Sequence, residues 1–354
     1  MLPSPSIRQQ MKSMIIDLYA SPNQKACYYS YDHQPLNQDL NNIIWDWSPE
    51  KMVQVEGNST CIFPLALGCP PIFTKTGEQW VEPLFDENTV LSATEFDLPI
   101  VDVSSGYSGF LLENMQKMLP QLEAYEIIRA PDIQSPFGIA ELICGSSIYM
   151  ALIMNPQPIH QLLQWITDFV IRFILEMRKI VGHRLNGTQF PYIWNNHEGT
   201  LCSDDSLSLM SPEMHLEFSL PYVNQIADAC GSLFYHSCIW QPSYFENIKQ
   251  VKKVRAYNWN LGNSCDPAHI IEQFSGQAVL APHFYPDIHK TNDVKKWGNF
   301  EDEAEVIRYF LDAMQENTSV YFWIESLGNK PKILSKIYHL MQEYGYSPEA
   351  RGIL

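Results

Sequence analysis

The feature that most constrains the fold is an alternation of short apolar, partly β-branched runs with amphipathic stretches, beginning near residue 125. Six runs have the length of strands: Glu126–Arg129, Pro191–Trp194, Ser232–His236, Val254–Asn258, Ala278–Ala281 and Ser319–Ile324. This alternation is typical of a parallel sheet covered by helices. It fits both a closed (β/α)8 barrel and an open doubly wound sheet, so periodicity alone does not choose between them.

The longest amphipathic stretch predicts a helix that opens at Asn155-Pro156. Its apolar face runs from Ile159 to Val181. Further helices are predicted after Ser211-Pro212, Glu301 and Pro331, with Ser211 as an N-cap.

The chain contains no repeat, low-complexity tract or linker-like run, which indicates a single domain spanning residues 1–354. Of its 354 residues 45% are hydrophobic, enough to bury a large core. Residues 1–90 show weak periodicity and are rich in proline, glycine and aromatics, so they are predicted to be an N-terminal elaboration. Residues 91–354 are expected to form the main body.

The balance of charge argues against nucleic acid and anionic membranes as partners. Lys and Arg number 23 against 40 Asp and Glu, a formal net charge of -17. Neither a signal peptide nor a long apolar span is evident, which predicts a cytoplasmic protein. The eight cysteines are scattered along the chain, and most are expected to be reduced core thiols.

Polar residues gather where the predicted strands end, the edge at which α/β folds carry their chemistry. These residues are Asn195, Asn196, His197, His236, Cys238, Asn258, Asn260, His283 and Glu325. His236 and Cys238 are two apart, so an imidazole nitrogen and a thiolate can point the same way toward a cation. A third ligand can come from Glu325 or Cys265, giving a zinc centre with one open position. The alternative is a hydrogen-bonded interior histidine beside a small core thiol.

Other residues at this edge are candidates for catalysis or substrate binding. Asp205 and His283 are candidate acid/base groups, although Asp204-Asp205 also fits a turn before a helix and His283 a solvated loop. The expected substrate-binding residues are Asn196, His197, Tyr257 and Asn260. No glycine-rich phosphate loop and no serine nucleophile elbow is present, so neither a nucleotide nor a nicotinamide cofactor is indicated.

A series of motifs resembles the uroporphyrinogen decarboxylase superfamily. It begins with Asp132-Ile-Gln-Ser-Pro136, Gly145 and Asn155-Pro156. It continues with Asp204-Asp205, Leu209-Met-Ser-Pro-Glu213, Glu217-Phe218, Pro221-Tyr222 and His236-Ser-Cys238, in the order and approximate spacing of that superfamily. The resemblance spans roughly residues 60–345. It implies a distorted (β/α)8 barrel, shared by porphyrinogen decarboxylases and zinc-dependent methyltransferases linked to corrinoids.

Two observations favour the methyltransferase branch. The decarboxylases carry an N-terminal arginine motif for substrate carboxylates, whereas Arg8 is followed here by Gln9-Gln10-Met11, and a polyanionic tetrapyrrole fits a chain of charge -17 poorly. The methyltransferases bind zinc through a His-x-Cys pair, which His236 and Cys238 match. Their later ligand is cysteine, where this chain has Glu325, which implies a harder site.

The resemblance therefore predicts a zinc-dependent methyltransferase that moves a methyl group from a methyl-corrinoid to a small thiol, with a corrinoid protein as a candidate partner. The metal ligands would be His236, Cys238 and Glu325, with Cys265 as the alternative third. Two rival hypotheses are a metal-free decarboxylase that uses Asp205 and a non-catalytic ligand-binding barrel. Trp45 and Trp47 would suit a homodimer interface.

Overall fold

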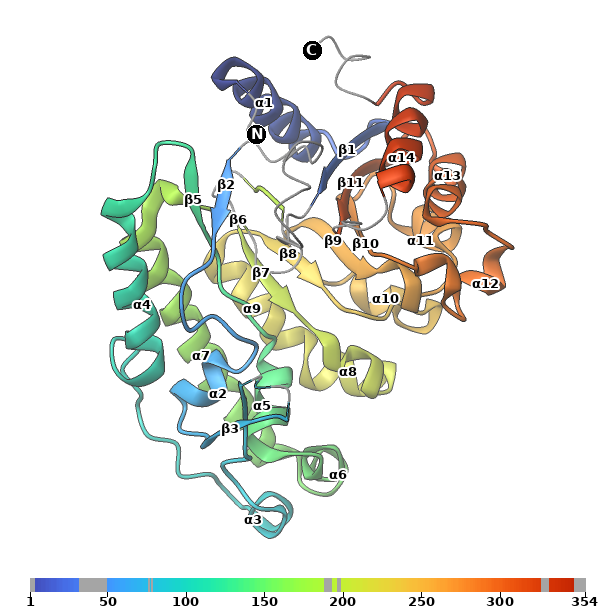
Figure 1. The fold of residues 1–354 in the computed structure, drawn as a ribbon. Helices are drawn as coiled ribbons and strands as arrows, with labels where there is room; N and C mark the ends of the chain where they lie inside the picture. Colours follow the sequence, from blue (N-terminus) through green and yellow to red (C-terminus); the bar gives the residue numbers. More distant parts are fainter. Residues whose placement is uncertain are drawn as a thin grey trace.

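The computed structural model describes residues 4–31, 50–75, 77, 79–187, 193–195, 199–325 and 331–346. These residues form a mixed α/β structure in which helices surround parallel strands (Figure 1). The predicted parallel α/β class is thereby confirmed.

The strands and helices have the following bounds. The strands are β1 Ala26–Tyr31, β2 Lys51–Val53, β3 Pro71–Phe73, β4 Gln79–Val81, β5 Glu126–Arg129, β6 Leu185–Gly187, β7 Thr200–Ser203, β8 Leu233–His236, β9 Val254–Asn260, β10 Val279–Phe284 and β11 Ser319–Ile324. The helices are α1 Pro5–Ala20, α2 Ile62–Ala66, α3 Glu87–Ser92, α4 Gly106–Met118, α5 Pro136–Cys144, α6 Ser147–Met154, α7 Pro156–Val181, α8 Pro212–Phe218, α9 Leu220–Cys230, α10 Phe245–Ile248, α11 Pro267–Phe274, α12 Val294–Trp297, α13 Glu303–Ala313 and α14 Pro331–Glu343. Short 3-10 helices include η4 Asp205–Leu209, η6 Leu261–Asn263 and η7 Ile288–Lys290.

The described strands pair in two parallel sheets and one antiparallel hairpin. The larger sheet has six strands in the order β1-β11-β10-β9-β8-β7, the smaller has the order β2-β5-β6, and β3 pairs with β4. A parallel bridge between Gln134 and Ser203 connects the chain after β5 to β7. All the strands of the large sheet therefore present their carboxyl ends at one edge, which is where the polar residues were predicted to gather.

Predicted and observed strands agree best in the second half of the chain. β5 and β11 have the predicted bounds, β8 begins one residue later, and β9 and β10 run further toward their carboxyl ends. Of the predicted strand Pro191–Trp194, residues 191 and 192 lie outside the described residues. Strand β7, Thr200–Ser203, was not predicted from the sequence.

The N-terminal 90 residues contribute more than a surface elaboration. β1 pairs in parallel with β11 over its whole length, and β2 pairs with β5. Neither segment was predicted from the sequence, because residues 1–90 are rich in proline, glycine and aromatics and show weak periodicity. This region therefore supplies strands to both parallel sheets.

Helix α7 is the long helix that the sequence predicted, with Pro156 in its first turn. Its buried face includes Ile166, Phe169 and Phe173, and it packs against α5 and α9. The helix predicted after Ser211-Pro212 is interrupted: α8 ends at Phe218 and α9 begins at Leu220. Pro221 explains the break, because its ring would clash with the carbonyl group four residues earlier and it has no N–H to donate.

Ser211 accepts a hydrogen bond from the backbone N–H of Met214, so the predicted N-cap is confirmed. None of the described helices is by itself long and apolar enough to cross a membrane. Together α5 and α6 meet that test by length and composition only, and the chain bends by 108° between them.

Candidate functional site

Three neighbouring strands bring polar side chains to one level of the large sheet, near their carboxyl ends. Ser203 of β7 pairs with His236 of β8, His236 pairs with Asn258 of β9, and Asn258 pairs with Ala281 of β10. Because side chains alternate along a strand, residues two positions further on point to the same side. This register places Cys238 one layer beyond His236, close to the start of η4.

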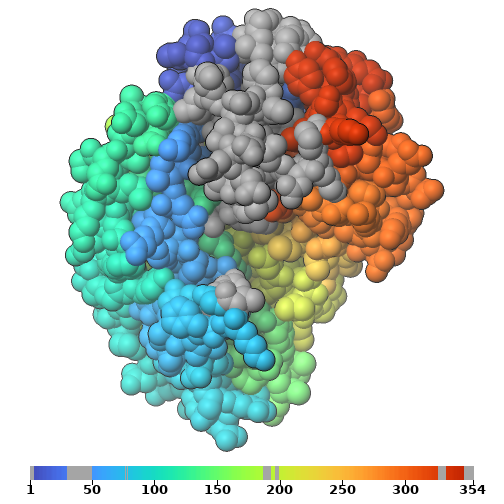
Figure 2. Space-filling model, in the orientation of Figure 1, coloured from blue at the N-terminus to red at the C-terminus, as the bar shows by residue number. Residues whose placement is uncertain are grey.

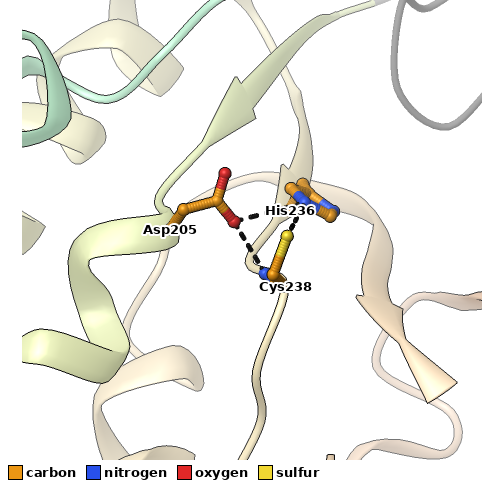
Figure 3. Close-up of side chains that lie close together, drawn as sticks. All are labelled: Asp205, His236 and Cys238. Atoms are coloured by element: carbon orange, nitrogen blue, oxygen red, sulfur yellow. Dashed lines mark hydrogen bonds and ion pairs between the residues drawn. The ribbon is translucent and has the colours of Figure 1, made fainter. Parts of the chain in front are cut away.

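Asp205, His236 and Cys238 converge at this edge (Figure 3). His236 Nε2 lies 3.3 Å from Asp205 Oδ1 and 3.4 Å from Cys238 Sγ. The backbone N–H of Cys238 donates to the same Asp205 oxygen at 2.7 Å. One nitrogen, one sulfur and one carboxylate oxygen thus lie within 4.8 Å of one another, a donor set that suits zinc.

Asn258 determines which nitrogen of His236 faces this group. Its Nδ2 donates to the backbone carbonyl of Ala281, so its Oδ1 is the atom that faces His236 Nδ1. His236 Nδ1 must then carry the hydrogen and donate it, which leaves the Nε2 lone pair directed at Asp205 and Cys238. The orientation of the imidazole therefore fits a metal ligand.

The electrostatics of the group follow from close packing of opposite charges. Burial by itself raises the pKa of Asp205, but His236 outweighs it and lowers the pKa to about 2. Burial likewise lowers the pKa of His236, while Asp205 and Cys238 raise it well above its usual value. Without a cation, the group therefore holds a proton on His236 Nε2, the atom at which a metal ion would replace it.

Asp204 points the opposite way from Asp205 and anchors the turn that carries both. Its fully buried carboxylate accepts hydrogen bonds from Ser219 Oγ at 2.9 Å and Tyr235 Oη at 3.0 Å, and it lies 2.9 Å from His215 Nε2. Burial raises its pKa, but His215 outweighs that effect and the net direction is downward. A buried carboxylate with three polar partners holds the start of η4 firmly, so Asp205 is well positioned.

Asp132 is a candidate site residue that was not predicted from the sequence. Its carboxyl group follows β5, accepts from Thr60 Oγ1 at 3.3 Å, and has no hydrogen-bond partner for Oδ1 among the described residues. Burial raises its pKa to about 6, and Asp205 adds to this effect while His236 opposes it. A carboxyl group whose pKa lies close to neutral pH, beside a group of possible metal ligands, can exchange a proton with a substrate. The rule of strand ends, applied to the predicted strand Glu126–Arg129, would have pointed to it.

His283 and Glu325 form a second polar pair on the neighbouring strands. His283 Nε2 lies 3.1 Å from Glu325 Oε2, and its ring stacks on Trp323 with centroids 3.9 Å apart. Burial lowers the pKa of His283, Glu325 opposes this effect, and His236 adds to it. His283 lies two residues beyond Ala281, the partner of Asn258, so its side chain points to the same side of the sheet as that of Asn258. Glu325 is nevertheless not among the described ligand atoms that converge on His236 and Cys238, where Asp205 takes the third position.

The structure places the remaining predicted site residues elsewhere or does not describe them. Tyr257 is buried between Trp240 and Phe274, with ring centroids 5.6 Å and 5.0 Å away, on the side of β9 opposite Asn258. Asn260 Oδ1 accepts from the backbone N–H of Gly262 and caps η6. Cys265 does not belong to the converging group of described residues, and burial raises its pKa to about 12. The predicted Asn196 and His197 lie outside the described residues.

A second group of possible ligands lies in the loop after β10. Asp287, His289 and Glu303 place their ligand atoms within 4.8 Å of one another. Glu303 Oε1 accepts from the backbone N–H of Asp287, and Lys290 pairs with the Asp287 carboxylate at 2.7 Å. These contacts give the group a structural role in holding the loop against α13.

A pocket opens beside Asp205, between α5, the start of α6 and the β3-β4 hairpin. It has a volume of about 440 Å³. Its polar lining comes from Thr60, Gln134, Glu141, Ser146, Asp205 and Ser206, and Trp80 adds an aromatic ring. In Figure 2 the light blue segment that includes the hairpin lies against the green segment of α5 and α6. A small molecule in this pocket would reach Asp205.

The comparisons with known proteins concern the fold. No protein-family model matches the chain, and no curated protein sequence matches it. Its fold is similar to that of a methyltransferase from Methanosarcina mazei, with a TM-score of 0.55. The sequence identity is 13%, and the match covers 83% of this chain and 80% of that chain. The similarity therefore extends over most of the α/β architecture.

Proposed function

We propose that the chain is a uroporphyrinogen decarboxylase-like methyltransferase that transfers a methyl group from a methyl-corrinoid to a small thiol. The observation that carries this proposal is the convergence of Asp205, His236 and Cys238 within 4.8 Å at the carboxyl edge of the large sheet. The similarity of fold to a methyltransferase supports it. The two parallel sheets would form the distorted (β/α)8 barrel of that superfamily, with the site at its mouth.

His236, Cys238 and Asp205 would hold zinc. Bound zinc would supply Lewis acidity that lowers the pKa of the acceptor thiol. Asn258 keeps His236 Nε2 directed at the group through its contact with Nδ1. The Cys238 N–H holds Asp205 in place.

A bound methyl-corrinoid would supply the methyl group: transfer would join the acceptor sulfur to the methyl carbon and break the cobalt–carbon bond, with the electron pair of that bond left on cobalt. Asp132 Oδ1, a buried oxygen with no hydrogen-bond partner among the described residues, would accept the thiol proton. The raised pKa of that carboxyl makes it a sufficient base near neutral pH. The pair of His283 and Glu325 would orient the polar groups of the substrate on the other side of the site.

The lining of the pocket argues against the rival decarboxylation of a polyanion. None of its described lining residues is Lys, Arg or His, whereas Glu141 and Asp205 add negative charge. A substrate with many carboxylates would meet repulsion there. A thiol substrate and a corrinoid protein as methyl carrier are compatible with this lining.

The test combines metal content with methyl transfer. Wild-type protein is purified, loaded with zinc, and assayed with methylcobalamin and 2-mercaptoethanol, with thioether formation as the readout. Cys238→Ser and His236→Ala are compared with Cys265→Ser as the matched control. We expect about one zinc per chain and thioether formation in the wild type and in Cys265→Ser, and neither in the other two variants.

Two results would contradict the proposal. If the wild type binds no zinc after loading, the metal centre does not exist. If zinc binds but no thioether forms with any thiol offered, the methyl-transfer function is wrong and the metal serves another reaction.

A further inference from the structure

The pocket beside Asp205 continues into a second, larger hollow. Both are lined by acidic side chains. The second hollow has a volume of about 1020 Å³ and shares Pro83, Gly145 and Ser146 with the first. Its described lining includes three carboxylates, from Glu82, Asp86 and Glu87, and no Lys, Arg or His. Together the two hollows therefore present five carboxylates without a basic side chain among their described lining residues.

Glu141 is the carboxylate best placed to act on a ligand inside the first pocket. It is half-buried on α5, and no described Lys, Arg or His forms an ion pair with it. Burial raises its pKa, and the nearby Tyr149 hydroxyl acts in the opposite direction. A partly desolvated carboxylate without a counter-charge attracts a cation more strongly than a fully solvated one does.

Trp80 gives the same pocket an aromatic wall. It lies on β4 of the hairpin, opposite Ile72, and 37% of its surface is exposed. The face of an indole ring attracts organic cations, and tryptophan does so best among aromatic side chains. An indole and a carboxylate on the walls of one pocket form a site for an ammonium group.

We propose that this pocket binds an ammonium group of the substrate, with Glu141 and Trp80 as the residues that select it. The inference rests on the proposed function only in one respect: the thiol of the same molecule would lie at the Asp205 end of the pocket. The acceptor is then a thiol that carries an ammonium group. An anionic thiol would meet the carboxylates of both hollows and is selected against.

The test compares small thiols that differ in charge. Cysteamine, 2-mercaptoethanol and 3-mercaptopropionate are titrated into zinc-loaded protein, and binding is followed by ligand-observed NMR. Ethylammonium, which has no thiol, is titrated into both zinc-loaded and zinc-free protein. The variants are Glu141→Gln and Trp80→Leu, with Glu113→Gln on α4 as the control outside both hollows.

We expect cysteamine to bind about tenfold more tightly than 2-mercaptoethanol, and 3-mercaptopropionate to bind most weakly. Glu141→Gln should reduce this preference to about threefold or less, and Trp80→Leu should weaken ethylammonium binding about threefold. Neither change should alter the zinc content, and Glu113→Gln should behave as the wild type.

The outcomes separate this inference from the proposed function. Ethylammonium binding that depends on Glu141 in a protein unable to bind zinc supports the ammonium pocket and contradicts the methyltransferase. Zinc-dependent thiol binding with no preference for cysteamine overturns the ammonium pocket and leaves the methyltransferase standing. Equal binding of ethylammonium to wild type and Glu141→Gln also overturns it.

Discussion

The side-chain amide of Asn258 determines which nitrogen of His236 faces Asp205 and Cys238. Asn258 donates through Nδ2 to the carbonyl of Ala281 on the next strand, so its oxygen can only accept from His236 Nδ1. Three neighbouring strands therefore act together to present one lone pair. Such supporting contacts fix the tautomer and orientation of a metal ligand.

Replacing Asn258 with alanine is expected to weaken zinc binding about 10- to 100-fold, because His236 loses the partner that fixes its tautomer. Competition with a chromophoric chelator measures the dissociation constant. The matched control is Asn247→Ala. Asn247 is also buried, and it donates to the Pro212 carbonyl and contacts His215 rather than His236.

Both variants should lose stability, but only Asn258→Ala should lose zinc affinity. Equal zinc affinity in the wild type and Asn258→Ala would show that the tautomer of His236 is not set by this contact.

Asp132 is expected to lower the free energy of unfolding when it is ionised, although the methyl-transfer activity requires it. The pKa of its carboxyl is near 3.9 in an unfolded chain and about 6 in the fold, raised first by burial and then by Asp205. A carboxyl whose folded-state pKa is raised makes the fold less stable once it ionises, so stability falls as pH rises from about 4 to 6. Asp132→Asn removes this cost. In zinc-free protein at pH 8 it should be about 2–3 kcal/mol more stable than the wild type.

Urea denaturation at pH 4 and at pH 8 checks this sign, because the two proteins should differ at pH 8 and converge at pH 4. Methyl transfer by Asp132→Asn should fall at least about 100-fold, since the variant cannot accept the thiol proton. Full activity in Asp132→Asn would contradict the assignment of Asp132 as proton acceptor, and a lower stability than the wild type at pH 8 would contradict the direction of its pKa shift.

The pairing of His236 with Cys238 could be predicted from the sequence, because it depends only on the alternation of side chains along a strand. His236 and Cys238 are two residues apart at the end of a strand, and alternation alone places their side chains on one side. The structure brings them together as that rule implies. The long helix α7 was equally predictable, because its apolar face repeats over its whole length.

The third member of the group depends on which strands are neighbours, and spacing along the chain does not contain that information. Asp205 lies beside His236 because β7 pairs with β8, and the sequence pattern did not identify β7 as a strand. Glu325 was the expected ligand, but it follows β11, which is three places from β8 in the sheet. It pairs instead with His283 on β10, the adjacent strand.

Asp302 should make stability depend on pH in the acid range. It caps α13 by accepting from the backbone N–H groups of Ala304 and Glu305, and it forms an ion pair with Lys336. Burial raises its pKa, but Lys336 and the two N–H groups outweigh that effect and lower it. A carboxyl whose pKa is lower in the fold than in the unfolded chain stabilises the fold at pH values above its unfolded-chain pKa, which is near 4. This contribution is lost as the pH falls through the folded-state pKa.

Asp302→Ala is therefore expected to cost about 1 kcal/mol at pH 7 and much less at pH 3, whereas Asp302→Asn keeps the cap and should cost less at pH 7. Thermal unfolding at the two pH values measures the difference. If Asp302→Ala is equally destabilising at both values, the ionised carboxylate is not the source of the stability.

Helix α7 offers the clearest test of where the core lies. Phe173 is fully buried and its ring packs edge-to-face on Phe63 of α2 with centroids 5.4 Å apart, whereas Leu175, two residues later, is 47% exposed. Phe173→Ala should cost about 3–5 kcal/mol because it leaves a cavity, and the milder Ile174→Val about 1 kcal/mol. Leu175→Ala should change the free energy of unfolding by less than about 0.5 kcal/mol. Urea denaturation measures these free energies of unfolding. If Leu175→Ala lowers the free energy of unfolding as much as Phe173→Ala does, α7 buries a different face from the one that its sequence periodicity and its packing indicate.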